Sequence, residues 1–141
     1  MLKLTSCLLL LALPSFAAAP LAKSEFHLNE QVERDIGYSQ AVRVGDTLYI
    51  SGSVGAGDMA TAIRQAYGEL KATLAAHGLD FRHVVKENVY TTNLDEFIKY
   101  KAIRKEYYAG ELPAATWVQV SRLYDPAHVL EVELVAVFPK T

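Results

Sequence analysis

The chain has almost no cysteine, and this excludes several kinds of chemistry. Its one cysteine, Cys7, lies near the start of the 141 residues. The rest of the chain therefore offers no thiol nucleophile, no disulfide and no sulfur ligand for a metal. The four histidines include no pair at helical i,i+3 or i,i+4 spacing, and no His-Glu-x-x-His motif occurs. We therefore expect no metal site.

An excess of basic residues is also missing. Fourteen lysines and arginines face sixteen acidic residues, which gives a net charge of −2, and like charges form no run. Because nucleic-acid binding needs a basic surface, we expect no nucleic-acid partner. The glycines at 52, 55 and 57 do not have the Gly-x-Gly-x-x-Gly spacing of a dinucleotide loop, and no Gly-x-Ser-x-Gly elbow is present. A flexible turn is the better interpretation of these glycines.

No apolar run is long enough to cross a membrane. Residues 1–17 have a basic start at Lys3, a short apolar stretch over 8–13 and then small residues, which is typical of a secretory signal peptide. A membrane anchor is the less favoured alternative, because a spanning helix needs about 20 apolar residues. We expect cleavage between Ala17 and Ala18, or near residue 19. The mature chain would be exported, periplasmic or secreted, and would have no membrane segment.

The remaining residues predict one α+β domain preceded by a polar lead-in over 18–35 that pairs weakly with the sheet. Alternating residues around Gly45-Asp46 predict a hairpin. Apolar residues at helical spacing predict helices, and β-branched runs predict strands. The expected elements are a hairpin over 38–52, a loop over 53–58, a helix over 59–77, a strand over 84–92, a helix from 93 or 95 to 108, and strands over 116–120 and 129–138.

This β-β-α-β-α-β-β order predicts a two-layer sandwich with a mixed sheet and both helices on one face. The other face would carry Tyr49, Trp117, Val135 and Val137, which are unsuited to solvent. Further copies of the same chain are the expected cover for that face.

Glu131 is the main candidate for chemistry. It lies in an otherwise apolar strand, where a desolvated carboxylate can act as a base towards water. The alternative is that Glu131 and Glu133 simply alternate with the core and meet solvent. Tyr38 can line a pocket or pack on the sheet, and Gly52 can admit a ligand or merely end a strand.

Taken together, these segments resemble the Rid family (RidA, also called YjgF), once described as ribonuclease-like translation inhibitors. The similarity covers residues 36–138, so we assign residues 36–141 to a Rid-like domain. It rests on these motifs: Ile36-Gly37-Tyr38-Ser39-Gln40-Ala41, Val44-Gly45-Asp46, Leu48-Tyr49-Ile50-Ser51-Gly52, Val84-Val85-Lys86, Asn88-Val89-Tyr90-Thr91-Thr92-Asn93-Leu94, Pro113-Ala114 and Leu130-Glu131-Val132-Glu133.

The resemblance implies a chorismate-mutase-like protomer and a homotrimer with ligand clefts between subunits. Active members hydrolyse reactive enamines and imines to carbonyl compounds and ammonia without a cofactor or metal. Tyr38 matches the family's pocket tyrosine, Ser51 and Gly52 match the pair whose backbone approaches the ligand, and Glu131 matches the glutamate that activates water.

Three positions depart from the family pattern. Ala115 stands where an arginine normally pairs with the substrate carboxylate, Trp117 replaces a frequent cysteine, and Lys101 replaces a pocket asparagine. Alanine supplies none of the arginine's bidentate contact. Lys101, Arg104 and Arg122 are possible replacements, although a solvated surface role is the favoured interpretation of all three.

Two functions therefore remain open. The first is a deaminase of small imines that uses Glu131, Tyr38 and Gly52. The alternative is a non-catalytic, exported trimer that binds a small molecule. The intact Glu131 favours the first, whereas Ala115 and Trp117 favour the second. Ribonuclease activity is disfavoured by the acidic charge and the expected export.

Overall fold

The computed structural model describes residues 20–140, so the expected signal segment and its cleavage site lie outside the described residues. These described residues form six strands, three α-helices and one short 3-10 helix. In chain order they are β1 (Ser24–Phe26), α1 (Glu30–Ile36), β2 (Ala41–Val44), β3 (Thr47–Ala56), α2 (Met59–Ala76), η1 (Phe81–His83), β4 (Val84–Thr91), α3 (Leu94–Tyr108), β5 (Ala114–Gln119) and β6 (His128–Val137).

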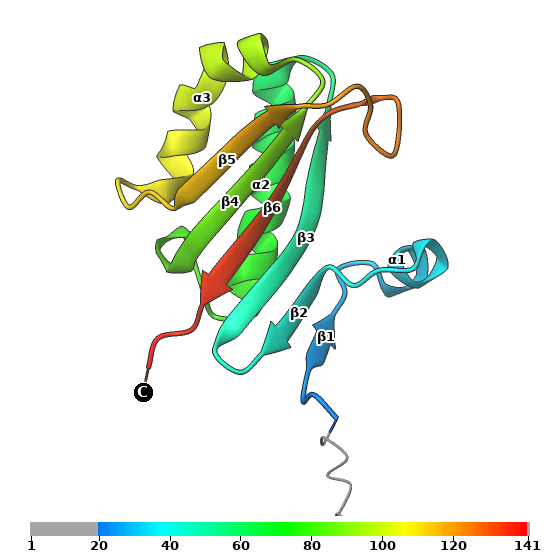
Figure 1. Cartoon of the computed structure of the whole chain (residues 1–141), viewed down its shortest axis with the longest axis vertical. Coiled ribbons are helices and arrows are strands. Elements are labelled where there is room, and N and C mark those ends of the chain that lie inside the picture. Colours follow the sequence, from blue (N-terminus) through cyan, green and yellow to red (C-terminus); the bar gives the residue numbers. More distant parts are fainter. Residues whose placement is uncertain (1–19, 141) are drawn as a thin grey trace, which may run out of the picture.

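The strands make one mixed sheet in the order β1-β2-β3-β6-β4-β5. All neighbours are antiparallel except β4 and β5, which are parallel because α3 carries the chain back between them. Figure 1 shows α2 and α3 together behind the sheet, with its front bare of helices. This arrangement confirms the predicted α+β architecture with two helices on one face.

The core lies between α2 and the middle of the sheet. Asp58 caps α2 by accepting a hydrogen bond from the backbone N–H of Thr61 at 3.0 Å, and Gly78 follows the helix at a φ of +69°. Burying each large aliphatic side chain contributes roughly 1.5–3 kcal/mol. The fully buried residues of this layer are Leu48, Ala62, Ile63, Ala66, Tyr67, Leu70, Leu74, Leu130, Val132 and Ala136.

Several details of the sequence prediction need correction. The lead-in contains helix α1, whereas we expected no helix there; its weak pairing with the sheet is confirmed by β1, which pairs with β2. The predicted loop over 53–58 is wrong for residues 53–56, which continue β3. Trp117 does not belong to the bare face, because its ring packs against Phe97 of α3, with ring centroids 5.2 Å apart.

The bare face of the sheet is partly apolar, as predicted. Tyr49, Val118 and Val137 are 52%, 38% and 37% exposed, which is unusual for large apolar side chains on one sheet face. At its centre, Glu133 accepts hydrogen bonds from Asn88 Nδ2 at 2.7 Å and from the Tyr90 hydroxyl at 3.1 Å. This face is therefore an apolar surface around a small polar cluster.

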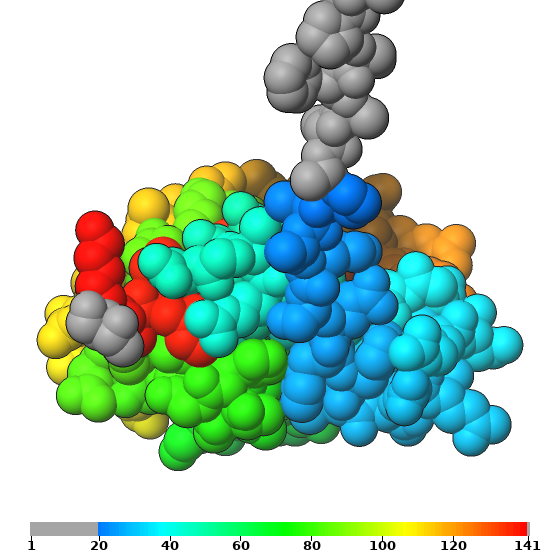
Figure 2. Space-filling view, turned by 90° about the horizontal axis from the view of Figure 1, so that it is seen from below, coloured from blue at the N-terminus to red at the C-terminus, as the bar shows by residue number. Residues whose placement is uncertain are grey.

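The N-terminal segment forms one side of the molecule. Seen from below in Figure 2, residues 20–40 (blue to cyan) lie beside α2, while the C-terminal residues (red) lie at the opposite side. Helix α1 begins at its cap Asn29 and ends at Gly37, which has a φ of +99°. The cap and the glycine are the ordinary boundary signals of a helix, so this short helix could have been predicted.

Candidate functional site

A cavity opens beside β3, beyond the first residue of strand β2. Ala41, the first residue of β2, pairs with Ile50, so the second half of β3 has no neighbour on that side. The free space is bounded by α1, α2 and the loop that leads into β6, and it measures about 450 Å³. Its walls are formed by Ile36, Tyr38, Ser51, Gly52, Val54, Glu69, Tyr124, His128 and Glu131.

A β-bulge places Ser51 and Gly52 at this cavity. Between the pairs Ile50–Leu134 and Ser53–Val132, strand β3 has one residue more than β6. Ile50 and Ser53 both point into the core, so the two residues between them are turned away from it. A bulge at this point therefore brings two consecutive residues of β3 to the wall of the cavity.

Gly52 is required for the position of Glu131. A Cβ atom at residue 52 would overlap Oε1, Cδ and Cγ of Glu131. The glutamate side chain therefore lies directly over the glycine backbone and crosses β3 towards the cavity. Any side chain at residue 52 would displace the carboxylate.

Glu131 is a half-buried carboxylate, and no lysine or arginine among the described residues contributes to the shift of its pKa. Burial raises its pKa above the ordinary 4.5, the neighbouring Glu133 raises it further, and His128 acts in the opposite direction. No hydrogen bond contributes to this shift within the part of the chain that the structure describes. A carboxylate of this kind holds a proton more readily than a solvated one, which is the property of a general base.

A second bulge, in β6, brings His128 to the same cavity. Gly55 pairs with Leu130 and Ala56 with His128, so Val129 is the extra residue. The carbonyl oxygen of Val129 accepts hydrogen bonds from the Thr91 hydroxyl at 2.8 Å and the Thr92 amide at 3.1 Å. Without the bulge, His128 would point into the core. With it, His128 and Glu131 share one wall.

The side chain of His128 lines the cavity. Its Nδ1 atom is buried and has no hydrogen-bond partner among the described residues. The imidazole is therefore a polar group on the same wall as Glu131.

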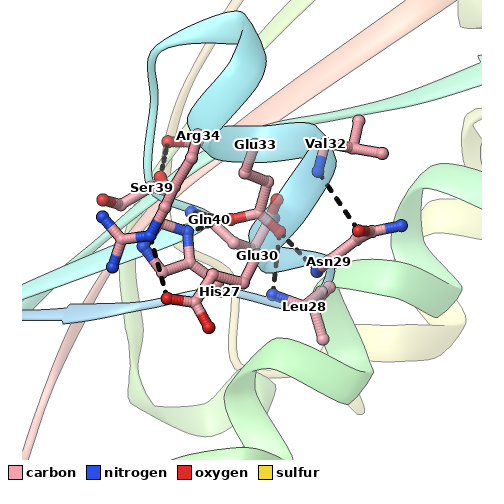
Figure 3. Close-up of polar contacts among 10 residues, drawn as sticks. His27, Leu28, Asn29, Glu30, Val32, Glu33, Arg34, Ser39 and Gln40 are labelled. Atoms are coloured by element: carbon pink, nitrogen blue, oxygen red, sulfur yellow. Dashed lines mark hydrogen bonds and ion pairs between the residues drawn. The ribbon is translucent and has the colours of Figure 1, made fainter.

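Glu33 holds the turn that carries Tyr38, and Figure 3 shows its carboxylate directed towards His27, Asn29 and Gln40. The Glu33 carboxylate accepts hydrogen bonds from the amides of Leu28, Asn29 and Gln40 at 2.7–2.9 Å and contacts His27 Nδ1 at 2.7 Å. Its carbonyl oxygen accepts from the Tyr38 amide at 3.0 Å. These contacts fix the turn that carries the Tyr38 ring to the cavity.

The structure thus brings together four of the predicted site residues: Tyr38, Ser51, Gly52 and Glu131. Within one chain the other three lie elsewhere. Ala115 pairs with Glu87 on the edge strand β5, Trp117 packs under α3, and Lys101 is exposed on α3. Their contribution to a ligand cleft stays a prediction that depends on a second subunit.

Sequence reasoning missed a buried polar cluster on the helix side of the sheet. Glu87 is fully buried and accepts bonds from Arg104 and from the hydroxyls of Tyr67 and Tyr108. The favoured surface role of Arg104 is therefore wrong, because its side chain is only 4% exposed. The available signal was Glu87, whose side chain falls on the same strand face as Val89.

A second hollow of the described chain is a groove between α2 and α3. It contains Arg82, whose guanidinium is bound to Asp80. Among residues 20–140 no group of three or more potential metal ligands is close enough to hold an ion. Over the same described range, no helix has the length and apolar character needed to cross a membrane.

Comparison with known proteins assigns the chain to a family. Its family model, described as Endoribonuclease L-PSP, matches residues 30–138. The chain is 35% identical over 129 residues to protein DfrA of Myxococcus xanthus, covering 83% of this chain and 97% of that protein. It is 38% identical over 109 residues to the 2-iminobutanoate/2-iminopropanoate deaminase of Mus musculus, covering 71% and 80% of the two chains.

Solved structures agree with this assignment. A Mycobacterium tuberculosis member of the YjgF/YER057c/UK114 family superposes with a TM-score of 0.75 at 25% identity, covering 82% of this chain and 99% of that one. A Thermotoga maritima protein superposes with a TM-score of 0.72 at 29% identity, covering 83% and 99%. The bulged site, the sheet order and the sequence match lead to one conclusion: the chain belongs to the Endoribonuclease L-PSP (YjgF/RidA) family.

Proposed function

We propose that the protein hydrolyses small reactive imines, or their enamine tautomers, to carbonyl compounds and ammonia. The observation that carries this proposal is the Glu131 carboxylate, which lies over Gly52 at the wall of a cavity that no described lysine or arginine lines. The deaminase relatives at 34–38% identity support the same reaction class.

In the proposed reaction Glu131 takes a proton from a water molecule as the water oxygen bonds to the imine carbon. The C=N π electrons move to nitrogen, which takes up a proton from solvent, and a carbinolamine results. Glu131 then returns its proton to the nitrogen. The C–N bond breaks with its electron pair going to nitrogen, the hydroxyl oxygen forms the C=O bond, and the hydroxyl proton is released to solvent. The products are a carbonyl compound and ammonia, and Glu131 is regenerated. A base with a raised pKa suits both proton transfers.

We further propose that the working unit is a homotrimer built through the bare sheet face. Tyr49, Val118 and Val137 are exposed there, and a second copy would remove them from water. This assembly would also bring the edge strand of one subunit, with Ala115, towards the cavity of another. Light scattering on the purified chain tests it, and a monomer at micromolar concentration would contradict it.

Export remains part of the proposal, because residues 1–17 have the composition of a signal peptide. N-terminal sequencing of the protein recovered from an exported fraction should begin near residue 18. Recovery of the chain with Lys3 intact from the cell interior would contradict export.

The test of the reaction is the loss of an imine made in place by a flavin oxidase. The purified protein should accelerate this loss over buffer. Glu131→Gln should lower kcat/KM by about 100-fold or more, because general-base catalysis contributes about 10²–10⁴. Since the pKa of Glu131 is raised, the activity of the wild type should fall as acidification protonates it, at a pH above the ordinary 4.5.

The matched control is Glu133→Gln, which removes a carboxylate from the same strand and face. Glu133 is held by Asn88 and Tyr90, and its replacement should leave most of the activity. Folding provides a second control: a raised pKa means that ionised Glu131 costs stability at neutral pH, so Glu131→Gln should be at least as stable as the wild type. An unaltered rate in Glu131→Gln would leave the non-catalytic binding trimer as the better function.

A further inference from the structure

Negative charge is in excess among the residues that line the cavity. Glu131 reaches it from β6 and Glu69 from α2, and no lysine or arginine is among the residues that line it. The pKa of Tyr38 shows the effect: burial raises it, and the negative charges of Glu33, Glu69 and Glu131 raise it further. Three carboxylates therefore act on the same corner of the cavity.

The neighbouring cations of the chain are held elsewhere. Arg104 is bound to Glu87 on the opposite face of the sheet, and Lys86 Nζ donates to the Thr116 hydroxyl at 2.7 Å. Arg122 is not among the residues that line the cavity, and its Nη2 donates to the carbonyl oxygen of Tyr124 at 3.2 Å. The alanine at 115 adds no charge. A carboxylated substrate would therefore meet repulsion from the residues that one protomer contributes to the cavity, and Ala115 of a neighbouring copy would not compensate it.

A cationic substrate would instead be attracted to the cavity. A protonated imine is attracted by two carboxylates, and the faces of Tyr38 and Tyr124 can contact a cation through their π electrons. Protonation also makes the imine carbon more electrophilic, so the same charges that bind the substrate favour attack by water.

We propose that the substrates are small imines that carry no carboxylate group and bind as iminium cations. This inference rests on the proposed deaminase function and narrows its substrate class. Glu69 is the specificity-determining residue: it faces the cavity from a different element than Glu131 and is not needed for the proton transfers.

The test compares two imines that differ only by a carboxylate. A flavin amino-acid oxidase acting on leucine makes the carboxylated imine, and a flavin amine oxidase acting on 3-methylbutylamine makes the corresponding imine without it. Semicarbazide traps the imine that remains in each case. The wild type should have a kcat/KM about tenfold or more higher for the carboxylate-free imine. A higher value for the leucine imine would overturn the inference while leaving the deaminase function intact.

Variants locate the cause of the preference. Glu69→Gln should lower the ratio of the two kcat/KM values about threefold or more, whereas Glu106→Gln, an exposed charge on α3, should leave it unchanged. An unchanged ratio in Glu69→Gln would overturn the role of Glu69. If Lys101→Gln or Arg122→Gln abolished turnover of the leucine imine, a cation outside this wall would be binding carboxylates, which would also overturn the inference. Failure on both imines would instead refute the proposed function.

Discussion

Two glutamates on neighbouring strands have opposite surroundings. Glu87 of β4 points towards the helices, where it receives hydrogen bonds from Arg104 Nε at 2.7 and 2.8 Å and from the hydroxyls of Tyr67 and Tyr108 at 2.5 and 2.9 Å. Glu131 of β6 points the other way and has no such donors. The difference separates a carboxylate whose oxygens are bonded to several donors from one that lacks such donors among the described residues.

The different surroundings of Glu87 and Glu131 explain the pKa shifts of the groups around them. Burying a carboxylate is costly unless its oxygens are bonded. Glu87 has four donors, which are Nε and Nη2 of Arg104 and the hydroxyls of Tyr67 and Tyr108. The partners respond: burial raises the pKa of Tyr67 well above its usual value, and the charge of Glu87 adds to this. Glu131 lacks such compensation and is left with a raised pKa. The bonded Glu87 stabilises the fold, whereas the uncompensated Glu131 costs stability and is the group that we propose to be reactive.

The largest expected effect comes from breaking the paired glutamate. Glu87→Gln leaves the buried Arg104 guanidinium without its counter-charge, so we expect the free energy of unfolding to fall by about 3–5 kcal/mol. Urea denaturation followed by circular dichroism measures it. A loss below about 1 kcal/mol would show that the cluster does not hold the two layers together.

A double variant separates charge from packing. Glu87→Met with Arg104→Met removes both charges and keeps much of the buried volume, so it should recover a large part of the stability lost in Glu87→Gln. The hydroxyls of Tyr67 and Tyr108 would lose their acceptor, which keeps the recovery incomplete. If the double variant were less stable than Glu87→Gln, unpaired charge would not be the reason for the first loss.

The second effect concerns the unpaired glutamate. Gly52→Ala places a Cβ atom where the Glu131 carboxylate lies, so the carboxylate must move. Misplacing a catalytic group by about 1 Å can cost about 100-fold in rate, and we expect kcat/KM for imine hydrolysis to fall by about that factor. The rate assay on an oxidase-generated imine measures it, with unfolding followed in parallel.

The matched control is Gly68→Ala in helix α2. A Cβ at residue 68 would meet no atom within 4 Å. Alanine is favoured over glycine in a helix by about 1 kcal/mol, so this variant should be slightly more stable and equally active. Equal activity of Gly52→Ala and the wild type would show that Glu131 need not lie over the glycine.

The sequence predicts the central strands and helices because their residues repeat with clear periods. Alternation in β6 and helical spacing in α2 are both visible without a structure, and both elements are found within one or two residues of the expected bounds. Glu131 stands out for the same reason: a charge interrupts an apolar strand. Helix α1 was missed because seven residues are too few to establish a period.

The bulges were beyond sequence reasoning. An extra residue in β3 or β6 changes which side chains share a face, but it leaves the composition of the strand unaltered. His128 consequently appeared to be an isolated histidine and not a neighbour of Glu131. Trp117 was assigned to the wrong face for a related reason, because its orientation depends on the parallel pairing of β5 with β4.

The smallest expected effect on stability concerns a third glutamate, Glu33. Its hydrogen bonds hold the turn that carries Tyr38 to the cavity. Burial alone would raise its pKa, but hydrogen bonds from the Asn29, Gln40 and Leu28 amides and from His27 outweigh burial and lower it below 4.5. A lowered pKa stabilises the fold above the unfolded value, and that stability is lost as the pH falls through the folded one. Glu33→Gln should therefore cost about 2 kcal/mol at neutral pH and progressively less under acid conditions, as measured by urea unfolding at several pH values.

Glu30 of the same helix is the matched control for this effect. Its bond to Arg34 Nε is 2.8 Å long, but the two side chains are 66% and 59% exposed. Exposed pairs of this kind contribute about 0.5 kcal/mol or less, so Glu30→Gln should change stability little at any pH. Because Glu33 also fixes the turn before Tyr38, its variant alone should lower the imine-hydrolysis rate, by a few-fold. Equal behaviour of the two variants would mean that the amide contacts of Glu33 do not position the Tyr38 wall of the cavity.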